Sequence, residues 1–242
     1  MRICVAQTQP ITGNIQQNIE NHKQLIALAV ANEADAIFFS ELSLTGYEPT
    51  LAIELATDQD DNRFDDFQTI SNAHQITIGV GVPTKNSAGV CISMLIFQPH
   101  RARQMYSKQY LHADEEPFFV SGQNLSGLVV SNINIALAIC YELSVPEHAA
   151  NAFSSGAPIY VASVAKSVKG IDKACARLSD IARSYAATVL MANSIGWADG
   201  DECAGRTSIW NSKGILVGQL NNKSEGILLI DTTTQEVVVK EV

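Results

Sequence analysis

The sequence feature that most constrains the fold is a series of short apolar runs that alternate with stretches of helical period. Residues 2–7 (RICVAQ) have the length and apolar content of a buried strand. After a turn signal at 12–14 (Thr-Gly-Asn), apolar residues recur at helical spacing over 15–30. Residues 35–40 (DAIFFS) form the next apolar run. The chain is therefore predicted to begin as strand, helix, strand.

The same alternation continues after a hairpin in the middle of the chain. Apolar runs at 90–97 and 102–107 are separated by a turn-like Gln-Pro-His-Arg link, which predicts an antiparallel hairpin. Helices alternating with strands, mixed with hairpins, favour a layered α/β sandwich with mixed sheets over a closed parallel barrel. The other predicted elements are helices at 62–74, 144–154 and 171–187 and strands at 75–83, 133–140, 158–163, 188–193, 206–210, 215–219 and 226–230.

Composition limits the domain organisation and the partners. No Pro/Gly/Ser-rich linker and no repeat of fixed period divides the chain, so one domain over residues 1–242 is expected. The formal net charge of -9 argues against a nucleic-acid partner. The N-terminus (MRICVAQTQP) lacks the apolar stretch of a signal peptide, and no apolar run approaches the length of a membrane span. We therefore expect a cytoplasmic protein with neither a nucleic-acid nor a membrane partner.

The cysteines and histidines predict neither a disulfide framework nor a metal site, because no CxxC pair and no pair of histidines at helical spacing occurs. The acidic cluster at 58–66 lacks the glycine and glutamate of a calcium loop and is expected to be a solvated face. No cofactor is expected. Cys4 and Cys91 should be buried in strands, Cys175 lies in a helical pattern, and Cys203 is expected to be exposed and oxidisable.

Three apolar runs end in a residue that can take part in chemistry. Glu41, Lys108 and Cys140 each come directly after such a run. In α/β proteins, active sites tend to be built at strand ends. Each residue alone also has a structural explanation, because most glutamates and lysines are solvated and an isolated cysteine is commonly a small core residue.

The segment after Cys140, Tyr-Glu-Leu-Ser-Val-Pro-Glu, indicates a sharp turn from strand into helix. Ser144 and Glu147 fit a capping box, with Pro146 in the first helical turn, so Glu147 is expected to be a cap and not a catalyst. A cysteine on such a bend presents its sulfur to a cleft, near backbone N–H groups that can hold a developing oxyanion. With no histidine nearby in sequence, a carboxylate is the candidate base and a lysine the candidate counter-charge.

Three segments together resemble, in order, the signature segments of the nitrilase superfamily of carbon–nitrogen hydrolases, in its amidase-like branch. They are 40–47 (SELSLTGY), Lys108-x-x-Leu111 and 140–147 (CYELSVPE). Residues 114–122 are similar to the family segment in which a second glutamate supports the site, and Glu115 fits that position best. Similarity at 182–183, 191–196 and 205–208 extends the resemblance over nearly the whole chain.

The resemblance implies a four-layer αββα sandwich with two mixed β-sheets, packed as a homodimer or a higher homo-oligomer. It also implies that Glu41 takes the thiol proton and that Cys140 attacks the amide carbon to form a thioester. Lys108 and the Tyr141 backbone N–H would hold the oxyanion, and Glu41 would then activate the water that releases the acid. Glu115 would orient Lys108 or the substrate, with Glu116 as the alternative for this role.

The substrate pocket is expected to be atypical for this family. Ser144 stands where many relatives carry an arginine, Ala186-Ala187 replaces a Glu-Asn pair, and 165–167 (Ala-Lys-Ser) replaces an aromatic residue. Lys166 and Lys169 could bind an acidic substrate, but solvated loop lysines are the commoner case. The residues predicted to contact the substrate are Tyr47, Glu116, Phe119, Tyr141 and Trp197.

We therefore expect a hydrolase that cleaves a small amide or carbamoyl compound to an acid and ammonia or an amine. One alternative is a nitrile hydrolase, because the same cysteine could attack a nitrile carbon. Another is a catalytically inactive module on the same fold that binds a metabolite or a protein.

Overall fold

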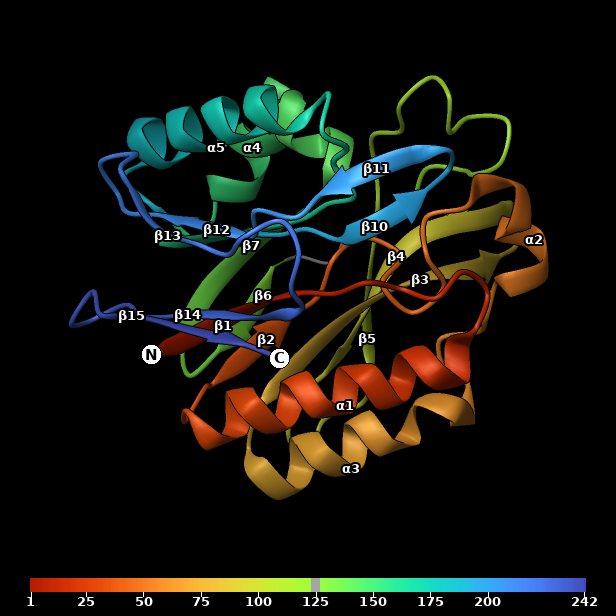
Figure 1. The fold of residues 1–242 in the computed structure, drawn as a ribbon, viewed down its shortest axis with the longest axis horizontal. Coiled ribbons are helices and arrows are strands. Elements are labelled where there is room, and N and C mark those ends of the chain that lie inside the picture. Colours follow the sequence, from red (N-terminus) through yellow and green to blue (C-terminus); the bar gives the residue numbers. More distant parts are fainter. Residues whose placement is uncertain (123–126) are drawn as a thin grey trace.

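Two large β-sheets face each other in the computed structural model, which describes residues 1–122 and 127–242 (Figure 1). In the first sheet the strands are ordered β15-β14-β1-β2-β3-β4-β5, and only β1, β2 and β3 pair in parallel. Its strands are β1 (Arg2–Gln7), β2 (Ala36–Phe38), β3 (Thr77–Asn86), β4 (Gly89–Phe97), β5 (Gln104–Ser107), β14 (Gly226–Asp231) and β15 (Val237–Glu241).

The second sheet is also mixed, with the order β13-β12-β9-β8-β7-β6 and parallel pairing of β7, β8 and β9. Its strands are β6 (Leu128–Val130), β7 (Ile133–Ile139), β8 (Ile159–Ser163), β9 (Thr188–Ala192), β12 (Ser208–Trp210) and β13 (Leu216–Gln219). A separate hairpin consists of β10 (Ile195–Ala198) and β11 (Asp201–Ala204).

Helices cover the outer face of each sheet. α1 (Ile15–Ala31) and α3 (Asp65–His74) lie on the first sheet, and α4 (Pro146–Phe153) and α5 (Ile171–Tyr185) lie on the second (Figure 1). These layers confirm the predicted αββα sandwich with two mixed sheets. No helix in the described part of the chain is long and apolar enough to cross a membrane. The short helices are η1 (Pro49–Leu51), α2 (Ala52–Leu55), η2 (Asn62–Phe64) and η3 (Cys140–Ser144).

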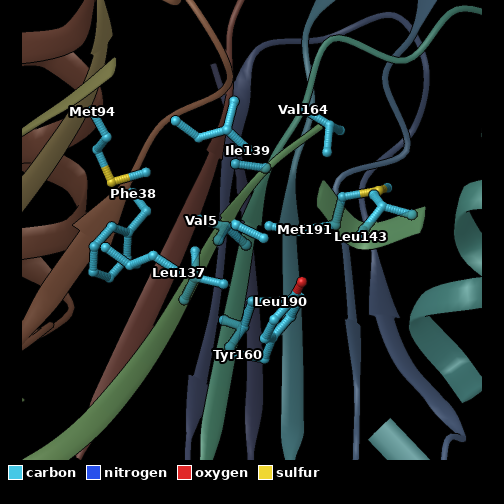
Figure 2. Packing of buried hydrophobic residues seen from close by; sticks show 14 of the residues in the cluster. Val5, Phe38, Met94, Leu137, Ile139, Leu143, Tyr160, Val164, Leu190 and Met191 are labelled. Carbon is cyan, nitrogen blue, oxygen red and sulfur yellow. The ribbon is translucent and has the colours of Figure 1, made fainter. Parts of the chain in front are cut away.

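The core follows from the two-residue period of the strands. On β1, Ile3 and Val5 belong to the apolar cluster shared by the two sheets, whereas Cys4 and Ala6 pack in the cluster with α1 and α3. Figure 2 shows Phe38 of the first sheet beside Leu137 of the second. Each fully buried apolar side chain of this size contributes about 1.5–3 kcal/mol.

The predicted strands and helices are present, with two corrections. The capping box at Ser144 and Glu147 is wrong, because η3 occupies 140–144 and α4 starts only at Pro146, with Val145 as an N-cap that makes no side-chain hydrogen bond. The expected exposure of Cys203 is also wrong, because this residue is on β11 and its exposed fraction is 5%. The sequence analysis did not predict β6, β10, β11 and β15.

Candidate active site

Hydroxyl side chains join the two sheets where their central parallel strands end. Ser40, after β2, and Ser194, after β9, are linked by a hydrogen bond of 2.7 Å between their Oγ atoms. Ser163, at the end of β8, donates a hydrogen bond of 2.7 Å to the Phe39 carbonyl oxygen. Thr8, after β1, forms an isolated parallel bridge with Ser194. Residues that follow these strands therefore meet at one end of the sandwich.

Lys108 lies at this end, fully buried between two carboxylates. Its Nζ donates hydrogen bonds to Glu41 Oε1 at 2.7 Å and to Glu115 Oε1 at 2.6 Å. Glu115 also accepts hydrogen bonds from the His112 backbone N–H at 2.7 Å and the Tyr47 hydroxyl at 3.0 Å. Both oxygens of Glu115 are thus engaged, whereas Glu41 Oε2 has no hydrogen-bond partner within the described residues.

Glu41 is on a tight loop that packs directly on β3. The Leu44 N–H donates to the Gly81 carbonyl oxygen at 2.9 Å, and the Gly81 N–H donates to Ser43 Oγ at 3.1 Å. A Cβ atom at Gly81 would lie 2.4 Å from the Ser40 carbonyl oxygen. Only glycine permits this close backbone approach, so the sequence of β3 fixes the position of the Glu41 loop.

Cys140 begins η3 immediately after β7, with a φ of +44° in the left-handed region. Glu142 holds this turn in place. Its Oε2 accepts hydrogen bonds from the Ile139 N–H at 2.8 Å and the Tyr106 hydroxyl at 2.7 Å, and its Oε1 accepts one from the Gln109 N–H at 2.6 Å. Glu142 therefore ties the end of β5, which carries Lys108, to the end of β7.

Cys140 faces a cavity of about 300 Å³, one wall of which is the β10–β11 hairpin. A second cavity of similar volume, lined by residues of β7 and α4 and largely apolar, contains none of Glu41, Lys108 and Cys140. The lining residues of the first cavity are Tyr47, His112, Asp114, Glu115, Cys140, Tyr141, Ala165, Lys166, Ser167, Gly170, Ala198, Asp199, Asp201 and Cys203.

The structure brings some of the predicted site residues together and leaves others apart. Tyr47 and Tyr141 line the cavity with Glu115 and Cys140. Phe119 does not line it, because its side chain is buried in the apolar core. Trp197 is 71% exposed and Glu116 is exposed, and neither lines the cavity. Phe119, Trp197 and Glu116 were predicted from their neighbouring motifs, but none of these side chains lines the cavity.

Burial and charge act in opposite directions on the pKa values of the site. Burial raises the pKa of Glu41 above its ordinary value, although the Lys108 charge opposes this shift. Burial lowers the pKa of Lys108, but the charges of Glu41, Cys140 and Glu115 outweigh it, so the ammonium stays charged. Burial and the Glu41 charge raise the pKa of Cys140, while Lys166 and Lys108 lower it. The resting site thus favours a thiol beside a carboxylate that binds protons readily.

The sequence analysis did not identify Glu142, and it favoured a solvated loop position for Lys166, which the structure corrects. Lys166 lines the cavity, whereas Lys169 is exposed and pairs with Asp201 at 2.6 Å. The available signal was position, because Lys166 comes three residues after β8 just as Glu41 comes three residues after β2. Within 1–122 and 127–242, no group of three or more His, Cys, Asp and Glu side chains is arranged to hold a metal ion.

Comparisons with known proteins identify the family and agree with the fold. Residues 2–239 match the family model for carbon-nitrogen hydrolases. The amidase from Nesterenkonia sp. AN1 has the same fold, with a TM-score of 0.85 and 22% identity over 96% of this chain and 92% of the amidase. A variant of that amidase in complex with butyramide gives a TM-score of 0.86 and 21% identity, over 97% of this chain and 92% of the variant.

A curated relative is considerably longer than this chain. The glutamine-dependent NAD(+) synthetase of Thermotoga maritima is 23% identical over 250 residues. The match covers 98% of this chain but only 42% of the synthetase. The likeness therefore concerns one part of that longer protein.

Proposed function

Because the chain belongs to the carbon-nitrogen hydrolase family, we propose that it hydrolyses a small amide or carbamoyl compound to an acid and ammonia or an amine. The observation that carries the proposal is the buried Glu41–Lys108–Glu115 cluster beside the cavity that holds Cys140. Burying a lysine between two carboxylates costs desolvation free energy that their attraction does not always repay, so stability alone is a weak reason for such a cluster. Its position beside a cysteine in a cavity favours a catalytic role.

The reaction begins with transfer of the Cys140 thiol proton to Glu41, whose Oε2 is without a partner among the described residues. The sulfur then attacks the carbonyl carbon of the amide. The Lys108 ammonium and the Tyr141 backbone N–H stabilise the negative charge that develops on the carbonyl oxygen. The amine leaves with the proton from Glu41, and a thioester on Cys140 remains.

Water completes the reaction by attacking the thioester, with Glu41 again accepting a proton. This step releases the acid and restores the thiol. Glu115 accepts a second hydrogen bond from Lys108 Nζ, beside the one to Glu41, and so acts as a positioning residue. No step requires a cofactor.

The relatives support a small amide as the substrate. The Nesterenkonia amidase was captured with butyramide, and in another structure acrylamide is attached to its active-site cysteine. The Thermotoga synthetase is named as glutamine-dependent. A cavity of about 300 Å³ in this protein is consistent with a substrate of similar size.

The test is an ammonia-release assay with a panel of small amides and carbamoyl compounds and the matching nitriles. We expect release from at least one amide, and a loss of at least about 1,000-fold in Cys140→Ala. Cys175→Ala is the matched control, because this half-buried cysteine lies on α5 outside the cavity. Release from nitriles alone would assign the nitrile alternative. No release from any compound, or release that survives Cys140→Ala, contradicts the proposal.

A further inference from the structure

Lys166 lies beside Cys140 because their strands are parallel neighbours. Ile139 at the end of β7 is in register with Ser163 at the end of β8, so the segments that follow leave the sheet at the same edge. Both side chains line the same cavity, and the charge of Cys140 raises the pKa of Lys166. Lys166 therefore lies at the cavity that holds the sulfur that attacks in the proposed reaction.

The backbone of Lys166 is fixed on both sides, unlike that of a solvated surface loop. Its N–H donates to Asn193 Oδ1 at 2.8 Å. Its carbonyl oxygen accepts hydrogen bonds from Asn193 Nδ2 at 3.2 Å and from the Ala204 N–H at 2.9 Å. Asn193 is fully buried and also donates to the Gly205 carbonyl oxygen at 2.7 Å. These contacts anchor the lysine at the cavity.

Among the described residues, Lys166 forms no ion pair with a carboxylate. Lys108 is paired with Glu41 and Glu115, and Lys169 is paired with Asp201. A cation next to a thiol favours the thiolate.

The charged side chains that act most strongly on Cys140 are two lysines and two glutamates. Lys108 and Lys166 are positive, and Glu41 and Glu115 are negative. Transfer of the thiol proton to Glu41 breaks an S–H bond and forms an O–H bond, and the total charge stays the same. The negative charge moves from Glu41 to the sulfur, which lies beside Lys166.

We propose that Lys166 is a further catalytic residue, whose ammonium pairs with the Cys140 thiolate and stabilises the state in which Glu41 holds the thiol proton. The inference rests on the proposed function for its place in the reaction. The Lys166 charge also opposes the rise that burial imposes on the Cys140 pKa. Lys166 remains protonated throughout, because its pKa is raised by the charge of Cys140.

The experiment measures the rate of Cys140 alkylation by iodoacetamide between pH 6 and 10, without substrate, by mass spectrometry of the Cys140 peptide. Lys166→Met removes the charge at similar length, and Lys166→Arg keeps a charge. Lys169→Met is the matched control on the same loop. We expect alkylation at pH 7 to be about tenfold slower or more in Lys166→Met, with the profile shifted upward by about one pH unit. Lys166→Arg should recover part of the rate, and Lys169→Met should match the wild type.

An unchanged alkylation profile in folded Lys166→Met overturns the proposal. If the profile is unchanged and KM rises only for amides that carry a carboxylate, Lys166 binds substrate instead, which also overturns it. Lys166→Gln provides a second neutral variant if Lys166→Met does not fold. Because alkylation needs no substrate, inactivity toward every amide would count against the proposed function and leave this result standing.

Discussion

Cys140 has a φ of +44°, a backbone conformation that residues with a Cβ atom rarely adopt. Such residues cost about 1–3 kcal/mol and persist only where the surroundings determine them. Here Glu142 supplies part of that constraint through the Ile139 N–H and the Tyr106 hydroxyl. The strained residue is the one whose sulfur attacks in the proposed reaction.

Glu41→Gln tests the base directly, because glutamine keeps the shape but removes the carboxylate. We expect kcat/KM to fall by about 10²–10⁴-fold, the range of general-base catalysis, while the protein stays folded by circular dichroism. In the wild type, activity should fall as the pH decreases toward the pKa of Glu41, because Glu41 then becomes protonated. Burial raises this pKa above its ordinary value of 4.5. The exposed Glu54→Gln is the control. An active Glu41→Gln enzyme would show that Glu41 is not the base.

At the residue scale, Glu41, Lys108 and Cys140 all stand directly after apolar runs in the sequence. In the structure Glu41 and Glu115 pair with Lys108, and Cys140 lines the cavity that Glu115 also lines, while the catalytic roles stay predictions. Lys166 could not be separated from a solvated loop lysine, because its backbone is held by Asn193, which follows another strand. Contacts between separate strands of this kind leave no local signal in the sequence.

At the scale of elements, the loop that carries Glu41 is packed between β3 and α1. On the β3 side lies Gly81, in contact with the loop backbone. On the α1 side lies His22, whose ring stacks on Phe39 with centroids 4.0 Å apart. Its Nε2 is hydrogen-bonded to Ser43 Oγ at 2.9 Å. Both elements therefore fix the residues that flank Glu41.

Gly81→Ala should displace this loop. The new Cβ would lie 2.4 Å from the Ser40 carbonyl oxygen and 2.5 Å from the Leu42 nitrogen, and backbone atoms cannot swing away. We expect a loss of about 1–3 kcal/mol in the free energy of unfolding, measured in urea, together with reduced kcat. Gly170→Ala, where the nearest atoms are 4.0 Å away, is the control for stability. Equal stability of Gly81→Ala and the wild type would contradict the packing described here.

His22 should make the protein sensitive to acid. Burial lowers its pKa from 6.5 to about 3, so between these values the unfolded chain binds a proton that the folded protein does not. Stability therefore falls as pH decreases below 6.5. From pH 7 to pH 5 this group alone should remove about 2 kcal/mol from the free energy of unfolding. Urea unfolding at pH 7 and pH 5 measures this loss. In His22→Gln the free energy of unfolding should fall by about 2 kcal/mol less than in the wild type. An identical fall in both proteins would contradict the assignment.

Helices and strands were predicted where the apolar pattern extends over a whole element, and were missed where it is short. The pattern identified α1, α5 and the central strands. The β10–β11 hairpin was missed because its residues are partly polar and it pairs outside the two main sheets, although Asp199-Gly200 is a turn signal. The capping box at Ser144 failed because the turn after Cys140 extends as η3 through that residue.

At the scale of the whole molecule, the two sheets form one sandwich (Figure 1). Hydrogen bonds between residues at the strand ends join the sheets next to the candidate site. Alternating strands and helices predicted layers, and the family resemblance supplied their number. Local sequence could not assign each strand to its sheet, because β1 pairs with β14 from the far end of the chain. Such pairings depend on burial of the complete sheet.

We propose that residues 1–242 form one domain that assembles into a homodimer or a larger homo-oligomer. On the outer layer of the second sheet, Phe153 of α4 stacks on Tyr185 of α5 at 4.2 Å, and Tyr185 is still 39% exposed. Aromatic side chains are enriched in protein–protein interfaces, so this stack is a candidate contact between copies of the chain. Light scattering should give at least twice the chain mass of 26.1 kDa. A mass equal to one chain across micromolar concentrations would contradict the assembly.

The central claim, that Cys140 carries the acyl group, is tested most directly by intact-mass analysis with peptide mapping. Glu115→Gln weakens the support of Lys108 and should slow turnover enough for the thioester to accumulate with a panel of small amides. We expect a mass increase equal to one acyl group on the Cys140 peptide, removable by hydroxylamine and absent in Cys140→Ala. Consumption of an amide with no adduct on Cys140 in this variant, or an adduct on another residue, would contradict the claim.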